Sequence, residues 1–220
     1  MTTTLADPRV AQALERMYRE TDEQMSDLYN RHTSLVSESA TPQERADALS
    51  DFYLPVAPDA GRLLYALVRA SRPDTVVEFG MSLGISGVHL AAAVRDNGAG
   101  RVVTTELSAA KVAAAKTTFK DTGLDDLITV LEGDALSTLQ TLDGSVGFVL
   151  LDGWKEFYLP VVKLLEPRLL PGALVVADNT DMEETRPYVD YVRDPANGYV
   201  SVTFPVRGAG SMEISCRATG

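Results

Sequence analysis

The sequence predicts an α/β fold in which helices cover both faces of a doubly wound, mostly parallel sheet of seven strands. Two observations predict it. Short apolar segments of β type alternate with helical segments along most of the chain, as is typical of parallel sheets. The last two β-type segments follow each other around a turn with no helix between them, which indicates an antiparallel hairpin at one edge.

Length and composition indicate one globular domain spanning residues 1–220. The chain has 220 residues, of which 45% are hydrophobic and 23% charged. Its formal net charge of −11 argues against a protein that works on nucleic acid, because phosphate backbones are bound by clustered Lys and Arg. We therefore expect no nucleic-acid partner.

Several features bear on location. The only cysteine is Cys216, so no internal disulfide can form, which suits a reducing compartment. The first ten residues lack the basic and apolar regions of a signal peptide, and no apolar run reaches about 18 residues. We expect a cytoplasmic protein that does not contact membranes.

Residues 1–55 form a helical appendage before the first strand. Asp7-Pro8 starts one helix, and Thr41-Pro42-Gln43-Glu44 is a capping box that starts another. This segment is either a lid or oligomer contact, or a plain packing layer. A further helix follows residues 55–61 and ends before Pro73.

The remaining elements follow in order. Expected strands lie at Thr75–Phe79, Arg101–Glu106 and Ile128–Leu131, in the two apolar runs that end at Asp152 and Asp178, and at Tyr199–Phe204 and Met212–Ser215. Expected helices run from the glycine loop 80–86 to about Arg95, from Ser108 to about Thr122, between the two acids, and from Asp181 to Val192. Gly123 is the expected residue after a helix end, and residues 207–210 are the hairpin turn.

Acidic and amide side chains close two neighbouring strands. Asp152 follows one apolar run, and Asp178 with Asn179 follows the next. Because parallel strands end at the same sheet edge, where ligands bind in open α/β folds, these side chains should lie close together. Their oxygens suit Mg²⁺. Lys155 lies three residues after the first acid.

The glycine loop predicts the kind of nucleotide ligand. It reads G-M-S-L-G from Gly80 to Gly84, without the close glycine spacing that a pyrophosphate requires. S-adenosylmethionine has no pyrophosphate and fits this loop better. Glu106, at the end of the next strand, lies where an acid would accept the ribose hydroxyls.

Taken together, these motifs resemble a known family. E-F-G-M-S-L-G-I-S, T-T-E-L-S, L-E-G-D-A, L-L-D-G-W-K-E-F-Y-L-P and V-V-A-D-N look like motifs of the metal-dependent branch of class I S-adenosylmethionine-dependent O-methyltransferases. That branch includes catechol and caffeoyl-CoA O-methyltransferases and their bacterial relatives. The resemblance covers about residues 54–216 and implies a Rossmann-like methyltransferase fold.

The resemblance also implies roles for individual residues. Asp152, Asp178 and Asn179 would hold Mg²⁺ or another divalent cation, and Lys155 would be the general base. The residues implied at the cofactor are Val56, Glu78, Gly80, Ser86, Glu106, Asp134, Ala135, Asp152 and Trp154. The acceptor would be a small hydroxylated molecule of catechol type, since a metal can chelate vicinal hydroxyls and acidify the one that reacts. Relatives of this branch imply a homodimer.

Two departures concern the acceptor. The animal catechol enzyme has His where this chain has Gly153, and it has a late Glu that grips the second hydroxyl. Between Tyr199 and Gly210 this chain has no acid. A hydroxylated natural product or a sugar-type diol is therefore an alternative acceptor. We assign no role to His32 or His89.

Three other functions are open. A metal-independent N- or C-methyltransferase would keep its activity in a chelator. A non-catalytic protein of the same fold would bind S-adenosylmethionine without turnover. A dinucleotide oxidoreductase is disfavoured by the loop spacing.

Overall fold

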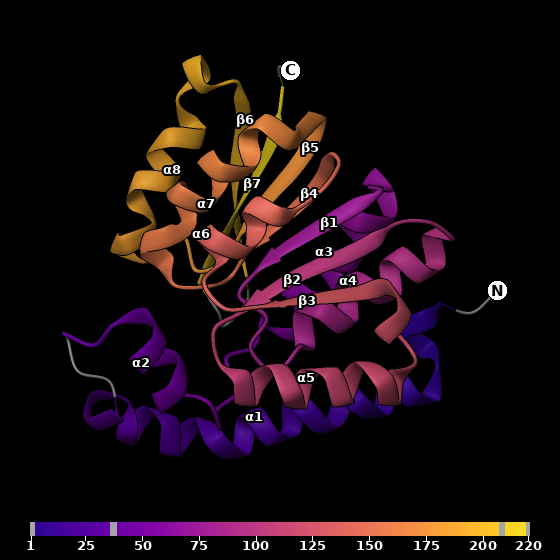
Figure 1. Cartoon of the computed structure of the whole chain (residues 1–220), viewed down its shortest axis with the longest axis vertical. Helices are drawn as coiled ribbons and strands as arrows, with labels where there is room; N and C mark the ends of the chain where they lie inside the picture. The colour runs from indigo at the N-terminus through magenta and orange to yellow at the C-terminus, as the bar shows by residue number, and fades with distance from the viewer. Residues whose placement is uncertain (1–2, 36–38, 207–209, 219–220) are drawn as a thin grey trace.

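The computed structural model describes residues 3–35, 39–206 and 210–218, with only the backbone described for 29–35. Its centre is a seven-stranded sheet in the order β3-β2-β1-β4-β5-β7-β6 (Figure 1). All neighbours are parallel except β7, which runs antiparallel to β5 and β6. The strands are β1 (Thr75–Phe79), β2 (Arg101–Glu106), β3 (Ile128–Glu132), β4 (Val146–Leu151), β5 (Leu169–Ala177), β6 (Tyr199–Pro205) and β7 (Ser211–Arg217). The predicted fold class is confirmed.

Helices cover both faces of this sheet. The α-helices are α1 (Pro8–Leu35), α2 (Pro42–Ala48), α3 (Pro58–Ser71), α4 (Ile85–Asn97), α5 (Ala109–Thr122), α6 (Ala135–Thr138), α7 (Tyr158–Leu165) and α8 (Arg186–Arg193). In Figure 1, α6, α7 and α8 lie on one side, and α1 runs beside α5 on the other. Short 3₁₀ segments join several of them.

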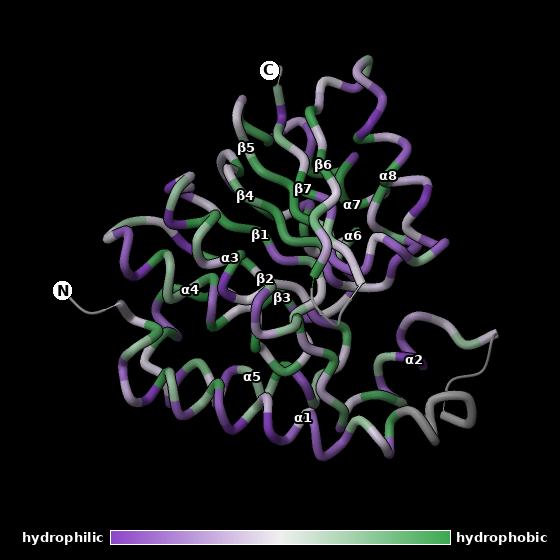
Figure 2. Tube along the Cα trace, turned by 180° about the vertical axis from the view of Figure 1, so that it is seen from behind, coloured by the Kyte–Doolittle hydropathy of each residue, from purple (hydrophilic) through white to green (hydrophobic). Residues whose placement is uncertain are grey.

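Successive strand residues face opposite cores, because side chains alternate across a strand. Val76 and Phe148 belong to the core formed with α1, α3, α4 and α5. Their neighbours Val77 and Val149 belong to the core formed with α6, α7 and α8. β1 and β4 are therefore buried throughout, as expected for central parallel strands, and Figure 2 shows the same strands as a hydrophobic centre.

Local signals set the helix ends as expected. Thr41 caps α2 in a capping box, in which its hydroxyl accepts from the Glu44 N–H and Glu44 accepts from the Thr41 N–H. Ser108 caps α5 through its hydroxyl, which accepts from the Lys111 N–H. Gly123 ends α5 in the left-handed conformation that glycine tolerates.

The helix predicted from Asp181 to Val192 begins later than expected. The α-helix starts at Arg186, preceded by a 3₁₀ turn at Glu183–Thr185. The reason lies in the hairpin. The Thr180 N–H donates to the Ser211 carbonyl at 2.9 Å. This backbone bond holds the segment after β5 against β7, so the helix starts only after it. Both hairpin strands are longer than predicted, and turn residues 207–209 lie outside the described residues.

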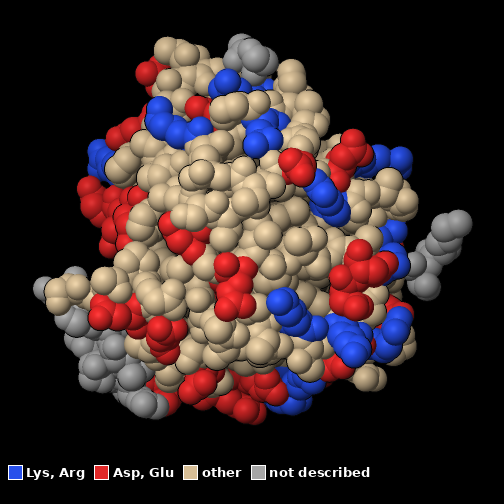
Figure 3. Space-filling model, in the orientation of Figure 1, with Lys and Arg blue, Asp and Glu red and all other residues tan. Residues whose placement is uncertain are grey.

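The outer surface adds two observations. Of the helices described, none combines the length and apolarity that a bilayer crossing requires. On the face shown in Figure 3, Lys and Arg side chains form small separate groups interspersed with acidic ones.

Candidate functional site

A cavity of about 680 Å³ lies at the carboxyl ends of the central strands and extends to the N-terminal helices. Its walls come from α1 and α2, from the segment before α3, from the ends of β1 to β5, and from the start of α5 and α6. Among the predicted site residues, those on its wall are Gly80, Glu106, Asp134, Ala135, Asp152, Trp154, Lys155 and Asn179. The residues that the sequence places at this edge of the sheet thus share one cavity.

The ends of β1 and β4 meet backbone to backbone. Gly80 has φ +92°, and a Cβ there would lie 2.5 Å from the Gly153 Cα. A Cβ on Gly153 would lie 2.6 Å from the ring of Phe79. Real Cβ atoms do not approach this closely. Position 80 therefore requires glycine because of the facing backbone, and position 153 requires glycine as long as Phe79 keeps its place. The departure at Gly153 is therefore matched by an aromatic ring that fills its space.

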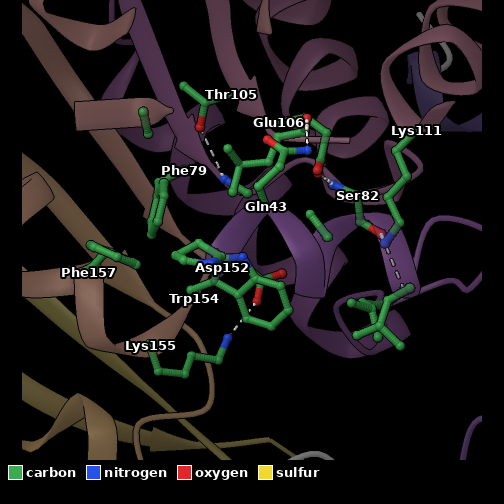
Figure 4. A pocket seen from close by; sticks show the side chains of 18 of the residues that line it. Gln43, Phe79, Ser82, Thr105, Glu106, Lys111, Asp152, Trp154, Lys155 and Phe157 are labelled. Carbon is green, nitrogen blue, oxygen red and sulfur yellow. Dashed lines mark hydrogen bonds and ion pairs between the residues drawn. The ribbon is translucent and has the colours of Figure 1, made fainter. Parts of the chain in front are cut away.

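Glu106 is held by the backbone at the end of β2. One carboxylate oxygen accepts from the Ser82 N–H at 2.8 Å, and the other accepts from the Ser108 N–H at 2.9 Å. These two donors come from the glycine loop and from the start of α5. Figure 4 shows Glu106 beside Ser82 on the cavity wall. A carboxylate fixed in this way retains lone pairs for hydroxyl donors in the cavity.

Asp152 and Lys155 form an ion pair at the end of β4. Lys155 Nζ lies 3.3 Å from Asp152 Oδ1, and the two side chains are 15% and 10% exposed. The ammonium also donates to the Tyr158 hydroxyl at 2.8 Å (Figure 4 shows the Lys155–Asp152 contact). The Tyr158 hydroxyl in turn donates to the Asp178 carbonyl at 3.0 Å, so it links the two strand ends.

Asp178 and Asn179 occupy the end of β5. Asp178 is buried, and one of its carboxylate oxygens accepts from the Asn179 N–H at 2.9 Å. Asn179 has φ +54°, a left-handed conformation that asparagine adopts more readily than most residues. Asn179 lines the cavity, whereas Asp178 is not among the lining residues.

The charges of this edge favour a cation. Burial raises the pKa of the Asp152 carboxyl, the neighbouring Asp178 charge raises it further, and Lys155 opposes both. Burial also raises the pKa of Asp178. Two buried carboxylates that disfavour each other's ionisation are relieved by a bound cation. Among the described residues, no group of three His, Cys, Asp or Glu is placed to hold a metal, and the predicted donor set has two carboxylates and an amide.

Three residues predicted at the cofactor lie behind the cavity wall. Val56 is buried in the core. Ser86 is buried at the start of α4. Glu78 is fully buried on β1, where one oxygen accepts from the Thr104 hydroxyl at 2.5 Å and the other has no partner among the described residues. Burial raises the pKa of Glu78 to about 7, although the hydroxyls of Ser86 and Thr104 act to lower it.

Helix α2 contacts both sides of the cavity mouth. The Gln43 side-chain amide donates to the Leu107 carbonyl after β2 at 3.3 Å. The Arg45 guanidinium lies 4.3 Å from the centre of the Trp154 ring and pairs with Glu156, both after β4. The α2 helix therefore bridges the two strand ends between which the cavity opens.

Sequence reasoning missed Tyr158 and Arg45. Tyr158 follows Lys155 by three residues, the spacing of neighbours on a helix, which was a usable signal. Arg45 reaches Glu156 across 111 residues of sequence, and no local pattern indicates that contact.

The late Glu of the animal catechol enzyme has no counterpart on β7 at the cavity. Glu213 is fully buried and forms two bonds with the Arg193 guanidinium, at 2.9 and 2.8 Å. This carboxylate is committed to α8, and Glu213 is not part of the cavity wall. Both departures from the catechol enzyme that the sequence shows, at Gly153 and at the late acid, are therefore present in the structure.

Comparisons with known proteins give consistent matches. A family model described as a methyltransferase domain matches residues 77–180. A probable O-methyltransferase of Mycobacterium tuberculosis is 32% identical over 149 residues, which cover 63% of each chain. The catechol O-methyltransferase of Mus musculus is 27% identical over 176 residues, covering 74% of this chain and 66% of that one. The matches thus span less than two thirds of these two relatives.

Solved structures match in fold. One is an O-methyltransferase from Streptomyces achromogenes that is involved in tomaymycin synthesis and was solved in complex with S-adenosylmethionine. It superposes with a TM-score of 0.69 at 21% identity, covering 91% of this chain and 99% of that one. At this identity the likeness concerns the fold.

Proposed function

We propose that the chain is a class I S-adenosylmethionine-dependent O-methyltransferase, like the relatives it matches, and that it methylates one hydroxyl of a small acceptor with vicinal hydroxyls. One observation carries the proposal: a single cavity is lined both by Glu106 and by Asp152, Lys155 and Asn179. The first suits the ribose of the methyl donor, and the other three suit a metal-bound acceptor.

The cofactor-binding part of the cavity fits S-adenosylmethionine. Glu106 has both oxygens fixed by backbone N–H groups and would accept the ribose hydroxyls. Gly80 lines the cavity, and Asp134, Ala135 and Trp154 supply the wall proposed for the adenine. When bound, S-adenosylmethionine supplies an electrophilic methyl group on sulfur.

Asp152, Asp178 and Asn179 would hold Mg²⁺. Their carboxylate and amide oxygens are the ligands this ion prefers, and the two acids are close enough to raise each other's cost of ionisation. When bound, the ion would orient two neighbouring hydroxyls and acidify one of them. Asp178 is not part of the cavity wall. To contact the ion, its side chain would have to turn toward the cavity; otherwise it would act on the ion through the residues that do contact it.

Lys155 would be the general base. Its Nζ is on the cavity wall and is held by Asp152 and Tyr158, so it is fixed before the acceptor binds. In the proposed reaction the Lys155 ammonium first loses a proton to water; the neutral amine then takes the proton of the hydroxyl that becomes the methyl ether and returns it to water afterwards. General-base catalysis of this kind contributes about 10² to 10⁴ in rate.

The acceptor proposed is aromatic and largely apolar. The cavity wall near Asp152 and Lys155 carries Phe79, Trp154 and Phe157, which suit a flat ring. Catechol-type molecules meet both requirements, and a hydroxylated natural product with the same diol is the alternative. A sugar-type diol would gain less from these rings.

The N-terminal segment, residues 1–55, is proposed to be a lid within a single domain. Its α2 helix contacts both sides of the cavity mouth through Gln43 and Arg45, so these contacts would have to open for ligand exchange. A homodimer and a cytoplasmic location complete the proposal. The dimer is supported by the edge strand β6, on which Val200 and Val202 are 68% and 60% exposed. A gel-filtration mass of one protomer would contradict it.

The function is tested by methyl transfer from isotope-labelled S-adenosylmethionine. The purified protein is incubated with Mg²⁺ and either 3,4-dihydroxybenzoate or 3-hydroxybenzoate, and products are identified by mass spectrometry. We expect labelled methyl ether from the diol alone. Equal products from both acceptors would contradict the chelation mechanism. Cofactor binding without any product, across a panel of diols, would favour a non-catalytic protein.

A further inference from the structure

Lys111 is a buried cation on the cavity wall that the proposed mechanism does not use. It lies in the first turn of α5, its side chain lines the cavity, and the residue is 3% exposed. Lysine is rarely buried to this extent unless it is paired. Within the part of the chain that the structure describes, its ammonium forms no ion pair, and the hydrogen bond it makes is to the Ser82 hydroxyl at 3.1 Å.

Ser82, the partner of Lys111, has a strained backbone. It has φ +50°, a left-handed conformation that costs free energy in a residue other than glycine. Its hydroxyl accepts from Lys111 Nζ and from the Leu54 N–H at 3.4 Å. These contacts tie the glycine loop to α5 on one side and to the segment before α3 on the other.

The same residue also holds Glu106. The Ser82 N–H donates to one Glu106 oxygen at 2.8 Å, and Ser82 makes this bond in its left-handed conformation. Lys111 and Glu106 also attract each other electrostatically. Figure 4 shows the Lys111 side chain running alongside Ser82, with Glu106 on the other side of that residue.

We infer that Lys111 is a positioning residue for the methyl donor, acting through Ser82 on Glu106. The inference rests on the proposed function, in which Glu106 accepts the ribose hydroxyls. Lys111 fixes the hydroxyl of Ser82, Ser82 keeps its N–H on Glu106, and Glu106 is held ready for the ribose. Lys111 does not touch the reacting atoms. Its loss therefore affects donor binding and leaves the methyl-transfer step unchanged at saturation.

A double-mutant cycle on the full-length protein tests this chain of contacts. Lys111→Met removes the charge while keeping the length of the side chain, and Ser82→Ala removes the hydroxyl. We expect each variant to weaken S-adenosylmethionine binding about tenfold in calorimetry, with kcat within about twofold of the unchanged protein. Because both changes break one path, the double variant should lose no more than either single variant.

Lys116→Met is the matched control, since Lys116 is an exposed lysine on the same helix. It should bind the donor as the unchanged protein does. Thermal unfolding of every variant shows whether it is folded, and if Lys111→Met does not fold, Ser82→Ala alone must still show the tenfold loss with unchanged kcat.

Three results would overturn the inference. Lys111→Met could bind the donor normally. In the double variant, the loss of donor affinity caused by Lys111→Met could multiply with the loss caused by Ser82→Ala, which would indicate that Lys111 contacts the donor directly. Its effect could fall on kcat with donor affinity unchanged. If the unchanged protein did not bind S-adenosylmethionine at all, the proposed function would fail and this inference with it, which is a distinct outcome.

Discussion

Lys155 and Asp152 form an ion pair of 3.3 Å across the first turn after β4, inside the cavity. The pair fixes the amine that would accept the hydroxyl proton. Tyr158 adds a second fixed contact at 2.8 Å, so the amine is held in place before any ligand binds. The proposed chemistry depends on this arrangement.

Lys155→Met should therefore reduce kcat by about 10² to 10⁴ and leave donor affinity within about twofold, because the general base is lost while Glu106 is untouched. Initial rates and calorimetric titration with S-adenosylmethionine measure the two quantities. Lys163→Met, which alters an exposed lysine of α7, is the control and should change neither. Unchanged turnover in Lys155→Met would remove this residue from the base role.

Asp178→Ala should reduce Mg²⁺-dependent turnover by about 10² to 10³, the usual cost of losing one preorganised electrostatic contact at a reacting centre. The Mg²⁺ concentration needed for half-maximal activity should rise as well. Donor affinity should stay constant, since Asp178 is not part of the cavity wall. Activity of Asp178→Ala equal to that of the unchanged protein, with or without metal, would favour a metal-independent methyltransferase.

Gly153→Ala should lower the free energy of unfolding by about 1 to 3 kcal/mol, because the new Cβ would lie 2.6 Å from the Phe79 ring. Urea denaturation measures this loss. Phe79→Leu alone should also be destabilising, but in the double variant the smaller side chain should relieve the clash and recover part of the loss. Strictly additive losses would contradict the direct packing between the two residues.

His89 should make the protein sensitive to acid. Its ring fills the space left by Gly61, is 3.4 Å from the Tyr18 hydroxyl, and faces the charge of Arg62. Burial first, and Arg62 second, lower the pKa of His89 from 6.5 to about 4. The neutral ring therefore contributes its full stability above pH 6.5, and this contribution is lost as pH falls from 6.5 toward 4.

Between pH 7.5 and pH 5 this loss should amount to about 2 kcal/mol, from the part of the pKa shift that lies in that range. The measurement compares urea denaturation of the unchanged protein with that of His89→Gln at both pH values. The comparison is needed because Glu78, whose pKa is raised to about 7, has the opposite dependence on pH. Equal pH dependence in the two proteins would contradict the buried neutral state of His89.

The sequence and the structure agree where a local rule decides. The alternation of strands and helices, the capping box at Thr41 and the glycine at position 123 are each set by nearby residues, and the structure has all three. The edge of the sheet at which these strands end follows from strand direction alone, and Glu106, Asp152 and Asn179 line one cavity there.

The differences arise from contacts between distant residues. Val56, Glu78 and Ser86 flank the glycine loop, but packing buries them, and they are not among the residues that line the cavity. The helix after Asp178 starts late because Thr180 is bonded to Ser211, 31 residues away. The ion pair between Arg45 and Glu156 and the burial of Lys111 depend on tertiary packing in the same way. His32 lies outside the residues whose side chains are described.

The most direct test of the central claim is the rate of methyl transfer to a simple catechol as Mg²⁺ is removed. The purified protein is assayed with saturating S-adenosylmethionine in Mg²⁺, in EDTA, and in EDTA followed by excess Mg²⁺. Metal-assisted transfer predicts product in the first and third conditions and a loss of at least about 10² in the second. Equal rates in all three conditions would contradict the roles proposed for Asp152, Asp178 and Asn179.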